Sequence, residues 1–385
     1  MIRLIHIVGI LACLFSNFSC QYKSATSHAS GTIDSASCYT NPLLSIGGPA
    51  FGALFHNGMY YYIRGVDDKI CLWALKDITE ITHEPTKTIW PVNDSQSYSH
   101  IWDPQIHYIN GKWYVYFSMD DGDSDNRQLH VLENASPDPL EGEFVLKGKI
   151  STDPHNNLAI YGHPFVHKGK LYLLWSGWKN KRIFEEMQCL YIAEMSDPWT
   201  LVSERVLISE PKYEWECQWV GTDGNKTAYP VYVNEMPCLF HSRNKDKLLI
   251  YYSASANWTP YHCIGLLVAS ADSDPLSPAS WTKLSEPVFR QSPENNAYAP
   301  GNICFVPSPD YKEWYMLYLV RNSLHDMLVV DNRSLWMQPI GWDEEGLPLL
   351  GKPVKEGEVF RKPSYTPSSS IGTIIVPING NGCAK

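Results

Sequence analysis

Residues 104–118 read PQIHYINGKWYVYFS, two apolar runs joined by the dipeptide Asn110-Gly111. Asn-Gly between hydrophobic runs is a strong β-hairpin signal, because both residues readily adopt the positive φ of a type I′ turn. The first run starts with a proline, and the second is rich in Trp and Tyr. This stretch therefore predicts two adjacent, largely buried antiparallel strands.

The same pattern occurs five times along the chain. Each copy has a proline-led apolar segment, a turn and a second strand rich in aromatic residues, and the turns start near residues 56, 110, 168, 244 and 310. Further strands lie between the copies, so each repeat of about 55 to 75 residues holds about four strands, the content of one propeller blade. Apolar patterns with a helical period are nearly absent. We therefore predict an all-β fold, a five-bladed β-propeller.

The segments outside the repeats have their own character. Residues 1–20 are typical of a signal peptide, and Cys20 is a candidate lipid anchor of a lipoprotein, with ordinary cleavage nearby as the alternative. We expect residues 21–40 to be a linker, 41–366 to be a propeller domain of catalytic type and 367–385 to be a tail. The predicted signal peptide therefore indicates a secreted, periplasmic or cell-surface protein. No second stretch is long and apolar enough to span a bilayer.

Composition narrows the class of partner. A formal charge of −10 and the lack of a basic run argue against nucleic acid or an anionic membrane. Aromatic residues make up 13% of the chain, which suits sugar rings, although a large β-rich core explains them equally well. The eight cysteines after the leader permit disulfides, but none has zinc-site spacing. We expect a carbohydrate partner, no bound metal and no cofactor.

A propeller brings one end of every innermost strand to a shared funnel. Glu235, in the stretch VYVNEMP at 231–237, begins a buried strand at that end. A glutamate there is costly to bury unless the protein uses it. The residues that we expect around the funnel are Pro49 and Ala50, Asp103 and Gln105, Tyr161 and His163, Glu235 and Met236, and Ala299 and Asn302.

Four stretches carry a recognisable pattern, namely IWDPQIHYINGKWYVYF at 101–117, LYLLWSGW at 171–178, YIAEMSDPWT at 191–200 and WDEEGLP at 342–348. In this order they resemble motifs of glycoside hydrolase family 43, in particular of its exo-acting alpha-L-arabinofuranosidase-like branch. The resemblance implies a five-bladed propeller and an inverting hydrolase of L-arabinofuranosides or related pentosides. Such enzymes use an aspartate base, an aspartate that tunes the acid, and a glutamate acid.

The resemblance keeps one of these three carboxylates. The sequence VNEMP at 233–237 matches a VNEGP motif and places Glu235 on the general acid. The base falls on Ala50, and the tuning aspartate of an AIDG motif falls on Tyr161. Two further departures are Gln105, in place of the glutamate of a WAPE motif, and Asn302, in place of a histidine associated with an axial water or metal site. The resemblance therefore implies that the propeller scaffold is kept, while two of the three catalytic carboxylates are replaced.

Other residues are candidates for the missing roles. Asp103 or His163 would serve as a replacement base, with a turn-capping aspartate and a structural histidine as the alternatives. Asp120, Asp121 and Asp123 form an acidic loop, either a solvated turn or a weak structural calcium site. We expect Gln105 and Asn302 to contact substrate. The candidate sugar platforms, which would pack equally well in a core, are Trp102, Tyr161, Trp175, Trp178 and Trp258.

Three functions remain open. The first is a glycoside hydrolase that uses Glu235 as its acid and a non-standard base. The second is a catalytically inactive propeller that binds a glycan in the former active-site funnel. The third is an interaction propeller without a sugar role, which the aromatic and polar residues of the funnel disfavour.

Overall fold

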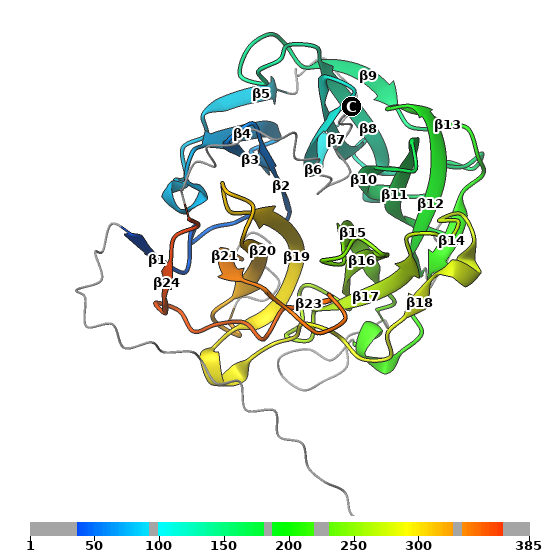
Figure 1. The fold of residues 1–385 in the computed structure, drawn as a ribbon. Helices are drawn as coiled ribbons and strands as arrows, with labels where there is room; N and C mark the ends of the chain where they lie inside the picture. Colours follow the sequence, from blue (N-terminus) through cyan, green and yellow to red (C-terminus); the bar gives the residue numbers. More distant parts are fainter. Residues whose placement is uncertain (1–36, 92–98, 181–186, 219–230, 326–332, 365–385) are drawn as a thin grey trace, which may run out of the picture.

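The computed structural model confirms the all-β, five-bladed propeller (Figure 1). It describes residues 37–91, 99–180, 187–218, 231–325 and 333–364. The predicted signal peptide, Cys20 and the predicted tail lie outside these ranges. Within them, no helix is long and apolar enough to cross a membrane.

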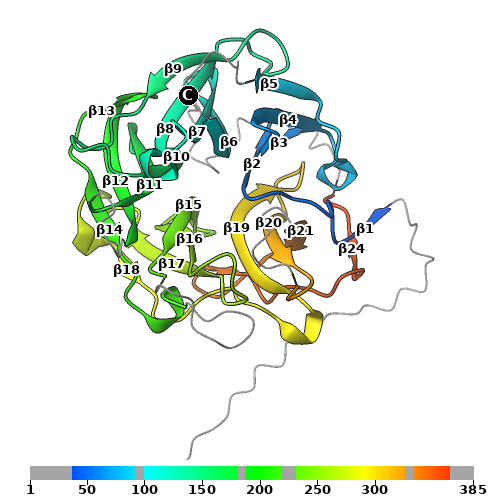
Figure 2. The same cartoon turned by 180° about the vertical axis from the view of Figure 1, so that it is seen from behind.

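Each blade is an antiparallel sheet whose strands follow one another in sequence from the axis outward. The innermost strands surround the axis in both views (Figures 1 and 2). Blade 1 comprises β2 (Phe51–His56), β3 (Met59–Val66), β4 (Lys69–Leu75) and β5 (Lys87–Pro91), and blade 2 comprises β6 (Ser99–Ile109), β7 (Lys112–Asp120), β8 (Gln128–Asn134) and β9 (Val145–Lys149).

The other three blades follow the same plan with local changes. Blade 3 has a strand more than blades 1 and 2, because both β13 and β14 pair with β12. It comprises β10 (Ala159–His167), β11 (Lys170–Trp178), β12 (Gln188–Asp197), β13 (Thr200–Leu201) and β14 (Val206–Ser209). Blade 4 comprises β15 (Asn234–His241), β16 (Lys247–Ala254), β17 (Cys263–Ser270) and β18 (Thr282–Lys283), and blade 5 comprises β19 (Tyr298–Pro307), β20 (Trp314–Arg321) and β21 (Ser334–Pro339).

Short elements complete the described chain. β1 (Cys38–Thr40) pairs with β24 (Val359–Arg361), so the two ends of the described chain are joined. β1 lies within residues 21–40, where the sequence predicts a linker. The remaining pieces are β22 (Gly341–Trp342), β23 (Pro348–Leu349) and the 3₁₀ turns η2 (Ile78–Glu80), η3 (Ser124–Asn126), η4 (Glu214–Glu216), η5 (Pro278–Ser280) and η6 (Pro293–Asn295).

The core lies between the blades. Five clusters of buried apolar residues each draw on two neighbouring blades, and together they cover all five blade interfaces. Apolar burial of this kind is the main favourable term in folding. It also holds the inner strands rigidly around the axis, which fixes the positions of the side chains at their ends.

A β-bulge near the start of four inner strands sets the geometry of the funnel. The pairing register breaks after Trp102 in β6, Ile160 in β10, Glu235 in β15 and Gly301 in β19. The next residue in each strand has a positive φ, namely Asp103 (49°), Tyr161 (57°), Met236 (53°) and Asn302 (51°). Bulges re-aim side chains, and a non-glycine residue at positive φ costs roughly 1 to 3 kcal/mol. Four blades therefore present corresponding, re-aimed positions to the funnel.

Candidate active site

Glu235 is buried at the funnel end of blade 4. Its side chain is only 7% exposed, and the Gln188 Nε2 atom donates a hydrogen bond of 2.9 Å to its Oε2 atom. Burial raises the pKa of Glu235 to about 7; the Gln188 hydrogen bond and the Arg333 charge oppose this rise, whereas the Asp103 charge adds to it. A carboxyl group with this pKa is about half protonated at pH 7, so it can serve as a general acid near neutral pH.

Glu216, in the 3₁₀ turn η4 that precedes blade 4, is a structural glutamate that can be compared with Glu235. It is fully buried, and the Lys283 ammonium lies 2.6 Å from its Oε1 atom. Tyr252 Oη and the backbone N–H groups of Lys212 and Tyr213 donate to its oxygens as well. Although burial alone would raise its pKa, the Lys283 charge and these hydrogen bonds lower it. The pKa shifts of the two glutamates therefore have opposite signs. The lowered pKa keeps Glu216 ionised, whereas the raised pKa lets Glu235 keep its proton to higher pH.

This contrast predicts opposite effects of the same substitution on stability. The folded-state pKa of Glu235, about 7, exceeds the usual value of 4.5, so folding stability falls as pH rises between these values. Glu235→Gln has no proton to lose, and we expect it to gain on the order of 3 kcal/mol relative to wild type between pH 4 and pH 8. Denaturant unfolding at both pH values measures this difference.

Glu216→Gln is the matched control. Its lowered pKa means that the wild-type carboxylate stabilises the fold above the usual pKa and loses this effect in acid. The substitution should therefore destabilise the protein at pH 8, by roughly 3 kcal/mol or more, because it leaves Lys283 without a buried counter-charge. Equal effects of the two substitutions would contradict the assignment of Glu235 as an acid.

Asp103 reaches from blade 2 to blade 3. It is 1% exposed, Ser118 Oγ donates to its Oδ1 atom, and the backbone N–H of Tyr161 donates to its Oδ2 atom. Burial raises its pKa to about 6, while these two hydrogen bonds and the Arg127 charge oppose the rise. Both carboxylate oxygens are thus engaged, and the charge of Asp103 lies at the bulge of Tyr161.

Tyr161 contacts Asp103 through its backbone N–H group. Burial raises the pKa of its phenol well above 10, and the charges of Glu235 and Asp103 add to this effect. Asp103, Tyr161 and Glu235 all lie near the starts of neighbouring inner strands, and Asp103 bonds to the backbone of Tyr161. Asp103 therefore brings a negative charge close to Tyr161, the position where the resemblance places the tuning aspartate.

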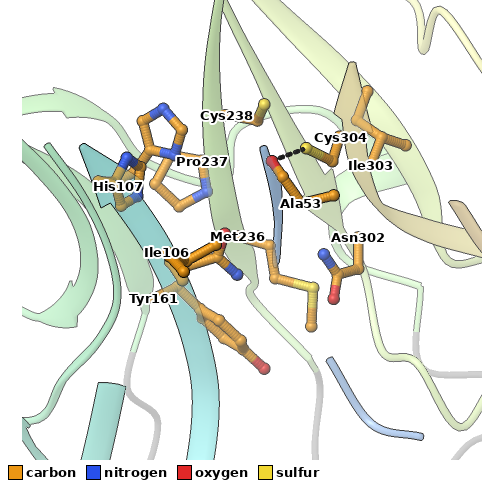
Figure 3. Close-up of a pocket in the computed structure, with 12 residues that line it drawn as sticks. Ala53, Ile106, His107, Tyr161, Met236, Pro237, Cys238, Asn302, Ile303 and Cys304 are labelled. Atoms are coloured by element: carbon orange, nitrogen blue, oxygen red, sulfur yellow. Dashed lines mark hydrogen bonds between the residues drawn. The ribbon is translucent and has the colours of Figure 1, made fainter. Parts of the chain in front are cut away.

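Several predicted site residues line a narrow cavity on the axis (Figure 3). All five inner strands contribute to its wall, and its volume of about 10 Å³ matches roughly one water molecule. Gln105 Nε2 donates to the Phe51 carbonyl (2.8 Å), and the Asn302 amide pairs with both the N–H and the carbonyl of Phe51. These amides join blades 2 and 5 to blade 1. That Gln105 and Asn302 bind substrate stays a prediction, and the cavity is too small for a sugar.

His163 belongs to this narrow cavity as well. Its Nε2 atom accepts a hydrogen bond from the backbone N–H of Leu239 (3.3 Å), and its side chain is buried. Burial lowers its pKa to about 4, so the imidazole is neutral near pH 7. Its ring packs edge-on against His107, with centroids 5.0 Å apart. These contacts describe a structural histidine, and its predicted role as base has no direct support from the geometry.

A wider cavity opens beside Asp103. It has a volume of about 430 Å³, within the range of small-molecule sites, and lies between blades 1 and 2. Ala50, Trp102 and Asp103 line it, together with Arg64 of β3. Ala50, where the resemblance places the base, therefore lies in the wall of a sugar-sized cavity. Its methyl side chain cannot act as a base.

The candidate aromatic platforms differ in exposure. Trp175 is fully buried and Trp178 is 4% exposed, so both pack in the interior. Trp102 is half-buried in the wall of the wider cavity, with the Arg127 guanidinium 4.3 Å from the centre of its ring. Trp258, 39% exposed, follows β16 at the end where Ala254 pairs with Asn234, next to Glu235. Trp102 lines the wider cavity and Trp258 is exposed, and that either contacts a sugar stays a prediction.

Carboxylates of the acidic loop accept hydrogen bonds from nearby residues. Asp120 accepts hydrogen bonds from His100, Gly122 and Arg127, and Asp121 accepts from Asn126. Among the described residues, no three His, Cys, Asp or Glu side chains are arranged to hold a metal ion. The amide of Asn302 is already bonded to Phe51. These residues do not fit a metal on the axis, and the absence of a cofactor stays a prediction.

Sequence reasoning missed three polar residues. Gln188 begins β12 and contacts Glu235 directly, but nothing in its sequence context marks it. Arg333 is fully buried, donates to the Pro49 carbonyl and acts on Glu235 through its charge. It precedes the apolar run of β21, so the rule that singled out Glu235, a charge at the start of a buried strand, would have found it. Arg64 lies near the end of β3, after an aromatic run, and would be found only by a search for any charge inside an apolar strand.

Comparison with known proteins agrees with this architecture. The model of the family described as Glycosyl hydrolases family 43 matches residues 39–348. An extracellular exo-alpha-(1->5)-L-arabinofuranosidase of Streptomyces avermitilis is 34% identical over 337 residues, which cover 86% of this chain and 66% of that protein. The chain thus spans slightly less than two thirds of that relative.

Two further matches extend over most of the other protein. An extracellular exo-alpha-(1->5)-L-arabinofuranosidase of Streptomyces chartreusis is 30% identical over 290 residues, covering 74% of this chain and 82% of that protein. The crystal structure of an alpha-L-arabinofuranosidase from Lactobacillus brevis superimposes with a TM-score of 0.74 and 29% identity, and the match covers 83% of this chain and 98% of that one.

Proposed function

The chain belongs to glycosyl hydrolase family 43, and from this premise we propose that it hydrolyses alpha-L-arabinofuranosides or related pentosides with Glu235 as the general acid. The observation that carries the proposal is the environment of Glu235. Burial raises its pKa to about 7, and it lies with Asp103 and Tyr161 at the funnel end of the inner strands. Its proton would pass to the glycosidic oxygen as the bond to the anomeric carbon breaks.

The protein offers no well-placed base to activate the attacking water, among the residues that the structure describes. Water must attack the anomeric carbon and lose a proton, and a carboxylate base normally takes that proton. Ala50 has no such group, both oxygens of Asp103 already accept hydrogen bonds, and His163 faces the narrow cavity. We expect the attacking water to lose its proton to solvent, so that wild-type turnover is slow.

We assign Asp103 to tuning rather than to the base. Its charge raises the pKa of Glu235 and lies against Tyr161, where the resemblance places the tuning aspartate. Asp103→Asn removes this charge and keeps a group of similar shape. The pKa of Glu235 should fall, so the decline of turnover on the alkaline side should begin at lower pH. A profile of kcat/KM against pH for both proteins measures the shift.

The D103N profile also separates tuning from structure. A merely structural role would lower the rate equally at all pH values and leave the shape of the profile unchanged. Should turnover be too slow to follow, NMR titration of ¹³C-labelled glutamate, with Glu235→Gln to assign the signal, reads the same pKa directly. An unchanged pKa would contradict the tuning role.

Product release tests the main proposal. Wild type and Glu235→Gln are incubated with aryl pentosides, arabinan and arabinoxylan oligosaccharides, and binding is followed in parallel by calorimetry. We expect slow release of pentose by wild type and its loss in the variant. Binding of a glycan without release by either protein would replace the hydrolase with the second function.

That second function is a propeller that binds a glycan without cleaving it. A specific observation favours it: Ala50 lines the sugar-sized cavity at the place of the base. Both functions require contact with extracellular carbohydrate. The predicted signal peptide and the two Streptomyces relatives named extracellular support an extracytoplasmic location, with a lipid anchor at Cys20 as one form of it.

A further inference from the structure

Arg64 presents an unsatisfied cation to the wider cavity. The residue is 8% exposed, and in the described part of the chain no acceptor pairs with its Nε atom and no carboxylate forms an ion pair with it. Its guanidinium carbon lies 5.5 Å from the centre of the Trp73 ring. A buried charge without a counter-charge is costly, and a guanidinium has five donors to satisfy.

The backbone around Arg64 makes room for this guanidinium. Gly48 has a φ of 83°, and a Cβ atom there would lie 3.0 Å from the Nη1 atom of Arg64. The guanidinium therefore packs directly against a glycine that few other residues could replace. Arg64 lines the cavity, and so does Ala50.

The other groups around the cavity leave Arg64 available to a ligand. Asp103 is engaged with Ser118 and Tyr161, and His100 pairs with Asp120. Asp67 and Asp68 lie exposed on the turn between β3 and β4, where solvent screens their charges. The carboxylate expected at Ala50 would have been the natural counter-charge in this wall, and it is absent from the sequence.

We propose that this cavity binds the carboxylate of an acidic glycan, a uronic acid residue, with the Arg64 guanidinium as its partner. The proposal rests on the proposed function in one respect, that the funnel is a glycan site. A guanidinium and a carboxylate form two parallel charge-assisted hydrogen bonds, a geometry that neutral hydroxyl groups do not offer. The cavity volume of about 430 Å³ accommodates a sugar ring beside Trp102.

Calorimetry with a matched pair of ligands tests this inference. A xylo-oligosaccharide that carries a glucuronosyl branch is compared with the same oligosaccharide without the branch. Wild type should bind the acidic ligand roughly 10-fold more tightly or better. Arg64→Gln should lose the preference, whereas Lys69→Gln, which removes an exposed positive charge at the start of β4, should keep it.

A second variant avoids the loss of a buried side chain. Ala50→Asp keeps Arg64 and adds a carboxylate to the same wall, which should compete for the guanidinium and reduce the acidic preference. Equal affinity of wild type for both ligands, a preference that persists in Arg64→Gln, or no binding of either ligand would overturn the inference. So would a stronger preference for a sulfated oligosaccharide. Acidic preference without any turnover would overturn only the hydrolase.

Discussion

Ala50→Asp is expected to increase turnover by about 100- to 10,000-fold, the usual contribution of a positioned general base. Ala50 precedes β2 and lines the wider cavity, so a carboxylate at this position has space to project toward a bound sugar. The Arg64 guanidinium in the same wall would keep that carboxylate ionised. The increase appears in kcat, measured as pentose release from an aryl arabinofuranoside at pH 6.5.

Ala50→Asn is the control for this substitution. Its side chain has the same shape as aspartate but cannot take a proton from water. We expect it to stay near the wild-type rate, with circular dichroism and thermal unfolding to confirm that both variants fold. Equal rates for the Asp and Asn variants would show that the loss of a base at Ala50 is not what limits the protein.

Glu235→Gln is expected to reduce turnover by about 100- to 10,000-fold on substrates with a poor leaving group. Glutamine keeps the size of the side chain and can still contact Gln188, but it carries no acidic proton. Wild-type activity should also fall as pH rises above about 7, since the acid must be protonated to act. The loss is measured as kcat/KM on an alkyl arabinofuranoside or an arabino-oligosaccharide.

The leaving group provides an internal control. A nitrophenolate departs without protonation, so a nitrophenyl arabinofuranoside should lose much less activity in Glu235→Gln than an alkyl glycoside does. If the variant lost activity equally on both substrates, damage to the binding site would explain the result better than loss of an acid. Unchanged activity on the alkyl glycoside would exclude Glu235 from the chemistry.

Much of the fold could be predicted from the turns. Asn57-Gly58, Asn110-Gly111 and Lys168-Gly169 each have two successive positive φ values, and each joins the first two strands of a blade. The short-range signal was sufficient there because turn geometry determines the register of a hairpin. The pairing of Cys38–Thr40 with Val359–Arg361 was not predictable, since these segments are far apart in sequence and no local pattern links them.

The sequence predicted which residues lie near the funnel, but not which cavity each side chain faces. Position in the repeat placed Glu235, Asp103 and Tyr161 near the starts of neighbouring inner strands, where Asp103 bonds to the backbone of Tyr161. The bulges also divided the predicted site residues between two cavities: Gln105 and His163 face the narrow axial cavity, while Trp102 and Asp103 face the wide one. A one-residue irregularity reverses the direction of a side chain, and sequence alone gives no reliable sign of it.

The central claim is that this propeller retains its acid at Glu235 and has lost its base at Ala50. The most direct test measures initial rates of sugar release from one unactivated arabinofuranoside by four proteins: wild type, Ala50→Asp, Glu235→Gln and the double variant. We predict slow release by wild type, fast release by Ala50→Asp, and none above background by either protein that lacks Glu235. A double variant as fast as Ala50→Asp, or an Ala50→Asp variant no faster than wild type, would contradict the claim.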